Sequence, residues 1–142
     1  MNKNIFKSIG AVLGGFIVIV VLSVGTDAIL KAAELLPYDH LFVSTELIVF
    51  VIFYRAFYSL IGCYIAAKLA PSNPMKHALA LGGVGIIVGS IGAVVAGHLG
   101  PAWYAWTLVV IALPVAWLGG RLFELRSNRS RMSEVVGIND GR

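Results

Sequence analysis

The fold is decided by the stretch LFVSTELIVFVIFYRAFYSLIGCYIAAKL, residues 41–69. It is long and apolar enough to cross a bilayer, which takes about 20 apolar residues. It nevertheless carries an arginine, Arg55, near its middle. A charge at that depth costs about 3 kcal/mol by the mildest scales, so such a residue is normally turned inward and paired. The rest of the chain must therefore supply neighbours for Arg55.

The composition indicates a membrane protein. Of the 142 residues, 58% are hydrophobic and 13% are charged, whereas soluble domains are about 25% charged. A soluble chain of this length could not bury so much apolar surface. The single cysteine, Cys63, excludes an internal disulfide and an all-cysteine metal site. We expect it to be a small, buried apolar side chain.

Four apolar stretches predict an all-α, polytopic bundle of four transmembrane helices in two antiparallel hairpins. The predicted spans are residues 8–30, 44–69, 78–97 and 103–123, which together form one unit over residues 1–123. Two prolines and an asparagine in residues 70–77 predict a tight turn. The polar tail, residues 124–142, has no apolar period, and we expect it to be a flexible, basic segment.

Lysine and arginine residues near the span ends gather on one side of the membrane. That side has Lys3, Lys7, Lys68, Lys76, Arg121, Arg126, Arg129 and Arg131. The other side has only Lys31, which is accompanied by Glu34, Asp39 and Glu46. Because cytoplasmic loops carry the excess of basic residues, both termini are expected in the cytoplasm, with the lipid bilayer as the main partner.

Helical spacing predicts the direction in which Arg55 points. At about 100° per residue it shares a face with small and polar side chains: Ser44, Ile48, Ser59, Gly62 and Ala66. The opposite face carries bulky apolar residues: Phe50, Phe53, Phe57, Ile61 and Tyr64. Small and polar residues face neighbouring helices in membranes. Arg55 should therefore point into the bundle, with Ser59 and Tyr58 as further polar candidates.

Asp27 has two candidate partners. Lys31 is its i,i+4 neighbour on the same helix, and this spacing favours an ion pair at the membrane rim. The alternative is Arg55 inside the bundle. Counted along the helices from Lys7 and from Lys68, Asp27 lies roughly 10 Å above Arg55, a gap that helix tilt and the long arginine side chain could close in part.

The third span is a packing helix. Its small residues recur every three or four positions and include Gly82, Gly85, Gly89, Gly92 and Gly97. Such surfaces let backbones approach closely. Packing within the chain and packing against a second copy both fit this pattern. The glycines do not form a nucleotide-binding loop, because no strand precedes them and they lie at membrane depth.

No catalytic or metal-binding motif is present. His98, Asp27 and Glu46 come out at similar outer depths, and histidine with carboxylates can bind a metal or a proton. No close ligand spacing joins them, so we interpret them as polar residues at a water interface. The sequence has no H-E-x-x-H motif, paired cysteines or Ser/His/Asp order. We therefore expect no enzyme, no metal, no cofactor and no nucleic-acid partner.

Three stretches carry a resemblance: YRAFYSLIGCYIAAKLAPSNPMKHALALGGVG at 54–85, GPAWY at 100–104 and LPVAWLGGRL at 113–122. Together they resemble a group of small, four-span bacterial inner-membrane proteins known mainly as hypothetical proteins. The resemblance implies the topology and a multi-pass location in the bacterial inner membrane, and no activity.

Two functions stay open from the sequence. One is a structural or accessory subunit that packs through its glycine-rich helix faces in a homo-oligomer or a larger membrane complex. The other is a small transporter or channel in which Arg55 binds an anion or gates a polar path. A polar cavity at Arg55 would favour transport, and a dry bundle with an exposed glycine face would favour assembly.

Overall fold

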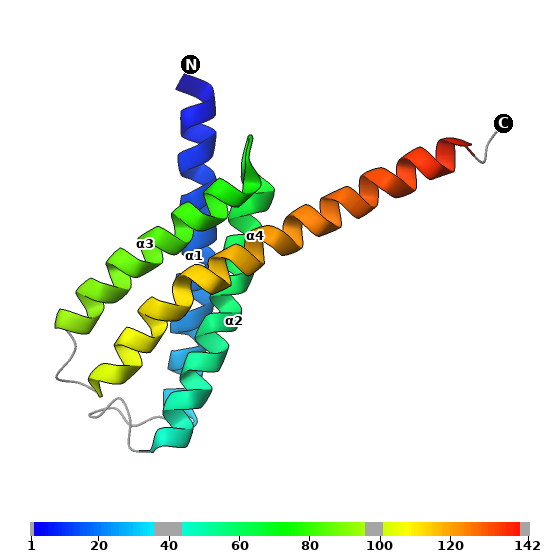
Figure 1. The fold of residues 1–142 in the computed structure, drawn as a ribbon. Helices are drawn as coiled ribbons and strands as arrows, with labels where there is room; N and C mark the ends of the chain where they lie inside the picture. Colours follow the sequence, from blue (N-terminus) through cyan, green and yellow to red (C-terminus); the bar gives the residue numbers. More distant parts are fainter. Residues whose placement is uncertain (1, 36–43, 96–100, 140–142) are drawn as a thin grey trace.

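The computed structural model describes residues 2–35, 44–95 and 101–139. These residues form four helices: α1 (Asn2–Ala32), α2 (Thr45–Leu69), α3 (Pro74–Val95) and α4 (Ala102–Asn139) (Figure 1). Each is long and apolar enough to cross a membrane, so the predicted all-α fold with four spans is confirmed. Large apolar side chains cover the outside, and Phe53, for example, is 74% exposed. That surface suits contact with lipid.

Helix α1 ends in a backbone motif at Glu34. This residue has a positive φ of 57°. Its N–H donates to the Lys31 carbonyl at 3.0 Å, and the Leu35 N–H donates to the Leu30 carbonyl at 2.9 Å. These two bonds form the Schellman arrangement, which satisfies carbonyls at the end of a helix and needs a left-handed residue. Glutamate occupies the position that glycine usually takes.

The turn between α2 and α3 is shorter than predicted. Ala70 leaves the helical conformation, with ψ of 130°, and Asn73 has a positive φ of 47°. Pro74 then begins α3, four positions before the predicted start at residue 78. Proline suits the first position of a helix because the N–H that it lacks would have no partner there.

The helices pack as two hairpins around α2. Helix α1 packs on α2 and α3 packs on α4, while α2 also contacts both helices of the second hairpin. Within the described residues, the backbones of α1 and α4 do not come into contact. In Figure 1, α3 and α4 run together at a slant to α1 and α2. The core where the hairpins cross is built mainly of small residues: Cys63, Ala66, Ala67, Ala78, Leu81 and Ala116.

Two glycine contacts bring the helix backbones together. A Cβ added at Gly62 would lie 2.7 Å from the backbone oxygen of Gly15 and 2.3 Å from Cγ1 of Ile19. A Cβ added at Gly119 would lie 3.0 Å from the backbone oxygen of Leu60. Without an aqueous phase between them, membrane helices depend on such close packing. Gly62 therefore holds α1 against α2, and Gly119 holds α4 against α2.

The tail differs from the flexible segment that the sequence predicted. Helix α4 continues through it to Asn139 and projects away from the bundle (Figure 1). Arg121 and Glu124 form an i,i+3 ion pair at 3.7 Å, and the Ser130 hydroxyl donates to the Arg126 carbonyl at 3.1 Å. Residues 121–136 contain neither proline nor glycine. Low hydrophobicity was thus compatible with a helix, because the tail lacks proline and its arginine, leucine, methionine and glutamate residues favour helix.

Candidate functional site

The partly buried charge in the middle of α2, Arg55, is paired with Asp27 of α1. Nη2 of Arg55 donates to Oδ2 of Asp27 at 2.5 Å, and the two side chains are 32% and 24% exposed. Lys31 makes no ion pair within the part of the chain that the structure describes. The structure therefore gives the pairing inside the bundle, and the rim pairing of Asp27 with Lys31 that the spacing favoured is wrong.

A difference in register explains why the depth count placed the two residues too far apart. The count took Lys7 and Lys68 to be level. In the structure, a Cβ on Gly14 would meet the side chain of Leu69, the last residue of α2, at 3.2 Å. Lys7 thus lies almost two turns beyond the end of α2, and Asp27 lies correspondingly closer to Arg55.

Tyr54 provides the second hydrogen bond to the Asp27 carboxylate. Its hydroxyl donates to Oδ1 while Arg55 donates to Oδ2, so both oxygens of the carboxylate are occupied. The Tyr54 side chain is buried, and it packs with Val51 against Tyr104 of α4. The sequence interpretation missed this residue because Tyr54 lies about 100° around the helix from Arg55. The sequence features that could have indicated this role are its position next to Arg55 and its polar hydroxyl group.

The next turn of α2 adds a neutral hydrogen bond to the same helix pair. The hydroxyls of Tyr58 and Thr26 lie 2.8 Å apart. The rings of Tyr54 and Tyr58 also lie against each other in a tilted arrangement, with centroids 5.7 Å apart. Tyr58, an expected polar candidate, therefore bonds to Thr26 rather than to the ion pair. The polar contacts of α1 with α2 thus involve five neighbouring side chains: Thr26, Asp27, Tyr54, Arg55 and Tyr58.

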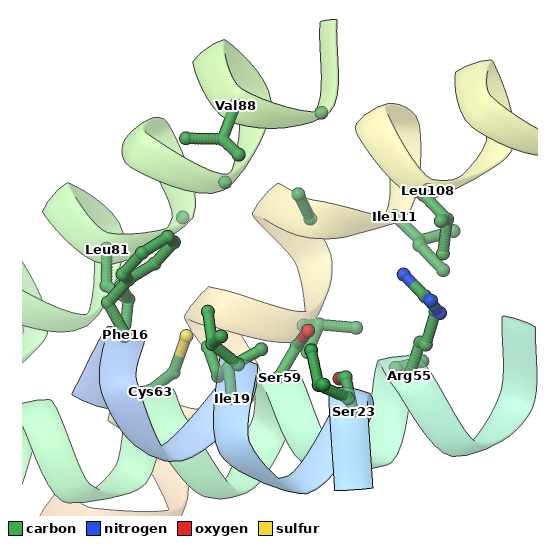
Figure 2. Close-up of a pocket in the computed structure, with 18 residues that line it drawn as sticks. Phe16, Ile19, Ser23, Arg55, Ser59, Cys63, Leu81, Val88, Leu108 and Ile111 are labelled. Atoms are coloured by element: carbon green, nitrogen blue, oxygen red, sulfur yellow. The ribbon is translucent and has the colours of Figure 1, made fainter. Parts of the chain in front are cut away.

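Arg55 keeps donors beyond the bond to Asp27. Its Nε is buried and has no hydrogen-bond partner among the described residues. Figure 2 shows the guanidinium directed across the bundle towards α4, where Leu108 and Ile111 lie beside it. A guanidinium binds a carboxylate or phosphate best through two parallel N–H groups. One side of the Arg55 fork is therefore occupied by Asp27, while Nε has no partner among the described residues.

A cavity of about 280 Å³ lies next to this guanidinium and is lined by all four helices (Figure 2). Apolar side chains such as Phe16, Leu81 and Val88 form most of its wall. The polar lining consists of Arg55 with the hydroxyls of Ser23 and Ser59. A cavity with an apolar body and a few polar groups at one end is typical of a small-molecule site.

The glycines of α3 divide into two groups. Gly82 and Gly89 pack against α4, since an added Cβ would lie 2.6 Å from Ala116 and 3.2 Å from Val109 respectively. Gly82, Gly85 and Gly89 also line the cavity, where the missing side chains leave room. Gly92 has nothing within 4 Å of an added Cβ. Of the two kinds of packing that its spacing allowed, it therefore does not show packing within the chain. Gly97 lies outside the described residues.

Asp27 and Glu46, which the sequence placed at a similar outer depth, do not form part of a metal site in the structure. Among the described residues, no three His, Cys, Asp or Glu side chains come close enough together to hold a metal ion. His98 lies outside those residues. Cys63 is buried, at 3% exposure, in the wall of the cavity.

Comparison with protein-family models, with curated proteins and with solved structures finds no match to the chain. The resemblance to four-span bacterial inner-membrane proteins stays a prediction. The chemistry of the site follows from its own residues: a fork-shaped cationic donor and two hydroxyls at one end of an apolar chamber. This arrangement can hold an acidic head group with a short apolar body attached to it.

Proposed function

We propose that the protein is a non-catalytic transporter for small amphipathic anions, with Arg55 as the residue that binds the acidic head. The observation that carries the proposal is the cavity of about 280 Å³ at Arg55, which is lined by all four helices. A charge inside a membrane bundle commonly marks a substrate pathway. The fold offers a reason for such a chamber, because the two hairpins slant away from each other (Figure 1).

The ligand class follows from the balance of polar and apolar lining. Arg55 supplies a cationic donor with a buried, unpartnered Nε, and a carboxylate, sulfonate or phosphate satisfies such donors in pairs. Ser23 and Ser59 can add hydroxyl donors at the same end. The remaining wall is apolar and offers no partner for a second charged group. A short alkyl chain with one acidic head fits both parts.

Asp27 has a defined part in this proposal. In the described structure it neutralises Arg55, so the pair carries no net charge and the cost of an unpaired cation is avoided. An entering anion would share Arg55 with Asp27, and the second hydrogen bond from Tyr54 would hold Asp27 in place meanwhile. Binding would therefore be reversible, as transport requires.

The orientation and location in this proposal rest on the sequence. The basic residues favour cytoplasmic termini, and the resemblance favours a bacterial inner membrane. The fold supports the first point, because the N-terminus and the turn between α2 and α3 lie at the same end of the bundle (Figure 1). This end carries Lys3, Lys7, Lys68 and Lys76.

A second candidate function is the structural or accessory subunit. Gly83 and Gly92 of α3 have nothing within 4 Å of an added Cβ, and Ile87, Ile91 and Val94 are exposed on the same helix. This surface would suit a second copy or a larger membrane partner. It is smaller than the sequence suggested, because Gly82 and Gly89 are already used against α4.

The test uses hexanesulfonate, whose head stays charged and crosses lipid slowly without help. We expect the full chain in proteoliposomes to take up hexanesulfonate and to take up neutral hexanol no faster than empty liposomes do. Arg55→Met should abolish the uptake. Gly85→Leu should reduce it at least tenfold by filling the cavity, since an added Cβ at Gly85 has its nearest neighbour at 3.9 Å.

Gly83→Leu is the matched control, because it makes the same change on the same helix at a position with open space around it. It should leave uptake unchanged. Uptake that survives both Arg55→Met and Gly85→Leu would contradict the proposal. Absence of uptake together with a stable oligomer that Gly83→Leu or Gly92→Leu disrupts would favour the accessory subunit instead.

A further inference from the structure

A second hollow lies outside the bundle, between α2 and the part of α4 that projects from it. Its volume is about 660 Å³. The residues that line it are Tyr64, Leu122, Leu125, Arg126, Arg129 and Ser130. The rings of Tyr64 and Phe123 pack with centroids 5.7 Å apart, so the place where α4 leaves α2 is fixed. The hollow is the wedge that opens beyond this contact.

The wedge has an apolar side and a cationic side. Leu122 and Leu125 are exposed and lie one helical turn apart on the same face of α4. Arg126 and Arg129 follow them along the helix and are also exposed. Neither arginine has an ion pair within the described residues, where Glu124 pairs with Arg121 instead. Two unpaired cations therefore stand at the end of an apolar surface.

The depth of the wedge coincides with the edge of the membrane. Tyr64 precedes Lys68 by one helical turn, about 6 Å along α2, and Lys68 lies at the end of that helix. The apolar spans of α2 and α4 both end here, so the surroundings change from acyl chains to lipid head groups. An apolar surface facing the acyl region with arginines at head-group level matches the two parts of a phospholipid.

We propose that this wedge binds an anionic phospholipid, with the phosphate between Arg126 and Arg129 and the first part of an acyl chain on Leu122 and Leu125. The site is independent of the Arg55 cavity and of the transport proposal. Charge complementarity selects anionic over zwitterionic lipid, because neither Arg126 nor Arg129 is neutralised by an ion pair in the described part of the chain. An arginine in direct contact with the lipid phosphate should raise the affinity about fivefold, which corresponds to about 1 kcal/mol per basic residue.

The test is native mass spectrometry of the full chain, released from nanodiscs that contain equal amounts of phosphatidylglycerol and phosphatidylcholine. We expect the chain to retain phosphatidylglycerol at least fivefold more than phosphatidylcholine. Arg126→Gln and Arg129→Gln should each lower this retention about fivefold. Leu125→Ser should lower the retention of both lipids. All of these positions are exposed, so the variants should fold, and a circular dichroism spectrum checks that they do.

Arg131→Gln is the matched control, because it removes the same charge from the same helix. Arg131 lies two residues after Arg129, about 200° around the helix, and does not line the wedge. It should leave retention unchanged. Equal losses in all three arginine variants would overturn the site in favour of general charge attraction. Equal retention of both lipids, or displacement by inorganic phosphate, would also overturn it, since the first indicates an apolar groove alone and the second a free anion site.

Discussion

Arg55 of α2 and Asp27 of α1 lie 28 positions apart in the chain, yet their side chains meet at 2.5 Å inside the bundle. Each is the other's counter-charge, and Tyr54 binds the second oxygen of Asp27. The pair therefore joins α1 to α2 within one hairpin. It does not join the two hairpins, which are held by small residues around Cys63 and Ala116.

Replacement of Asp27 by asparagine should destabilise the protein. Arg55 would keep its charge but lose the carboxylate, and removal of one partner of a buried ion pair is costly. Because both side chains are partly exposed, we expect a loss of about 2 kcal/mol, below the full cost of a buried pair. Unfolding by sodium dodecyl sulfate in mixed micelles measures this free energy.

The double variant Asp27→Asn with Arg55→Gln provides the control. If the interaction is an ion pair, the double variant should be more stable than the sum of the two single losses predicts. Lys31→Gln should have little effect, because Lys31 makes no ion pair in the described structure. A large loss in Lys31→Gln together with a small one in Arg55→Gln would contradict the observed pairing.

Loss of the hydroxyl of Tyr58 should have a small effect. The bond to Thr26 at 2.8 Å is neutral and partly buried, and neutral hydrogen bonds between membrane helices contribute about 0.6 kcal/mol. We expect Tyr58→Phe and Thr26→Val each to cost about that much in the same unfolding assay. The two losses should not add in the double variant. Additive losses would show that the hydroxyls bond to other groups.

Two glycine-to-alanine changes should affect the free energy of unfolding differently. An added methyl at Gly62 meets the backbone oxygen of Gly15 at 2.7 Å, so Gly62→Ala must push α1 and α2 apart. Overpacking of this kind costs about 1–3 kcal/mol. Gly25 has nothing within 4 Å, and Gly25→Ala should be neutral or stabilise by up to about 1 kcal/mol through helix propensity. A comparable loss at both positions would contradict the close contact at Gly62.

Removal of the chain after Phe123 should leave the bundle intact. The segment projects from the bundle (Figure 1), while the contact of Phe123 with Tyr64 is kept. We expect an unchanged unfolding midpoint and a loss of helical circular dichroism that corresponds to residues 124–139. An unchanged spectrum per molecule would show that the tail is not helical in solution.

The spans and the inward direction of Arg55 were predictable from local pattern. Each span is long enough that the apolar run alone identifies it, and the phenylalanines at 50, 53 and 57 are exposed as their helix face predicted. The direction of a side chain depends only on the helical repeat. It therefore needs no knowledge of the neighbouring helices.

The partner of Arg55 and the cavity could not be predicted in the same way. The pairing with Asp27 depends on the vertical offset of α1 against α2, which is set by the meeting of Gly15 with Gly62. Lysines at the membrane surface do not report that offset, because their side chains reach the interface from several depths. The cavity depends on the slant between two hairpins. Nothing local in the chain records that angle.

The ion pair within the first hairpin bears on how the chain enters the membrane during its synthesis. Helix α1 is made before α2 and carries Asp27, whose basic neighbour on the same helix, Lys31, makes no ion pair in the described residues. An unpaired aspartate opposes insertion, by up to about 3 kcal/mol at the centre of a span and by less towards its end, until α2 delivers Arg55 and Tyr54 to it. The two helices therefore have reason to leave the translocation machinery together, as a neutral pair, with the second hairpin following independently.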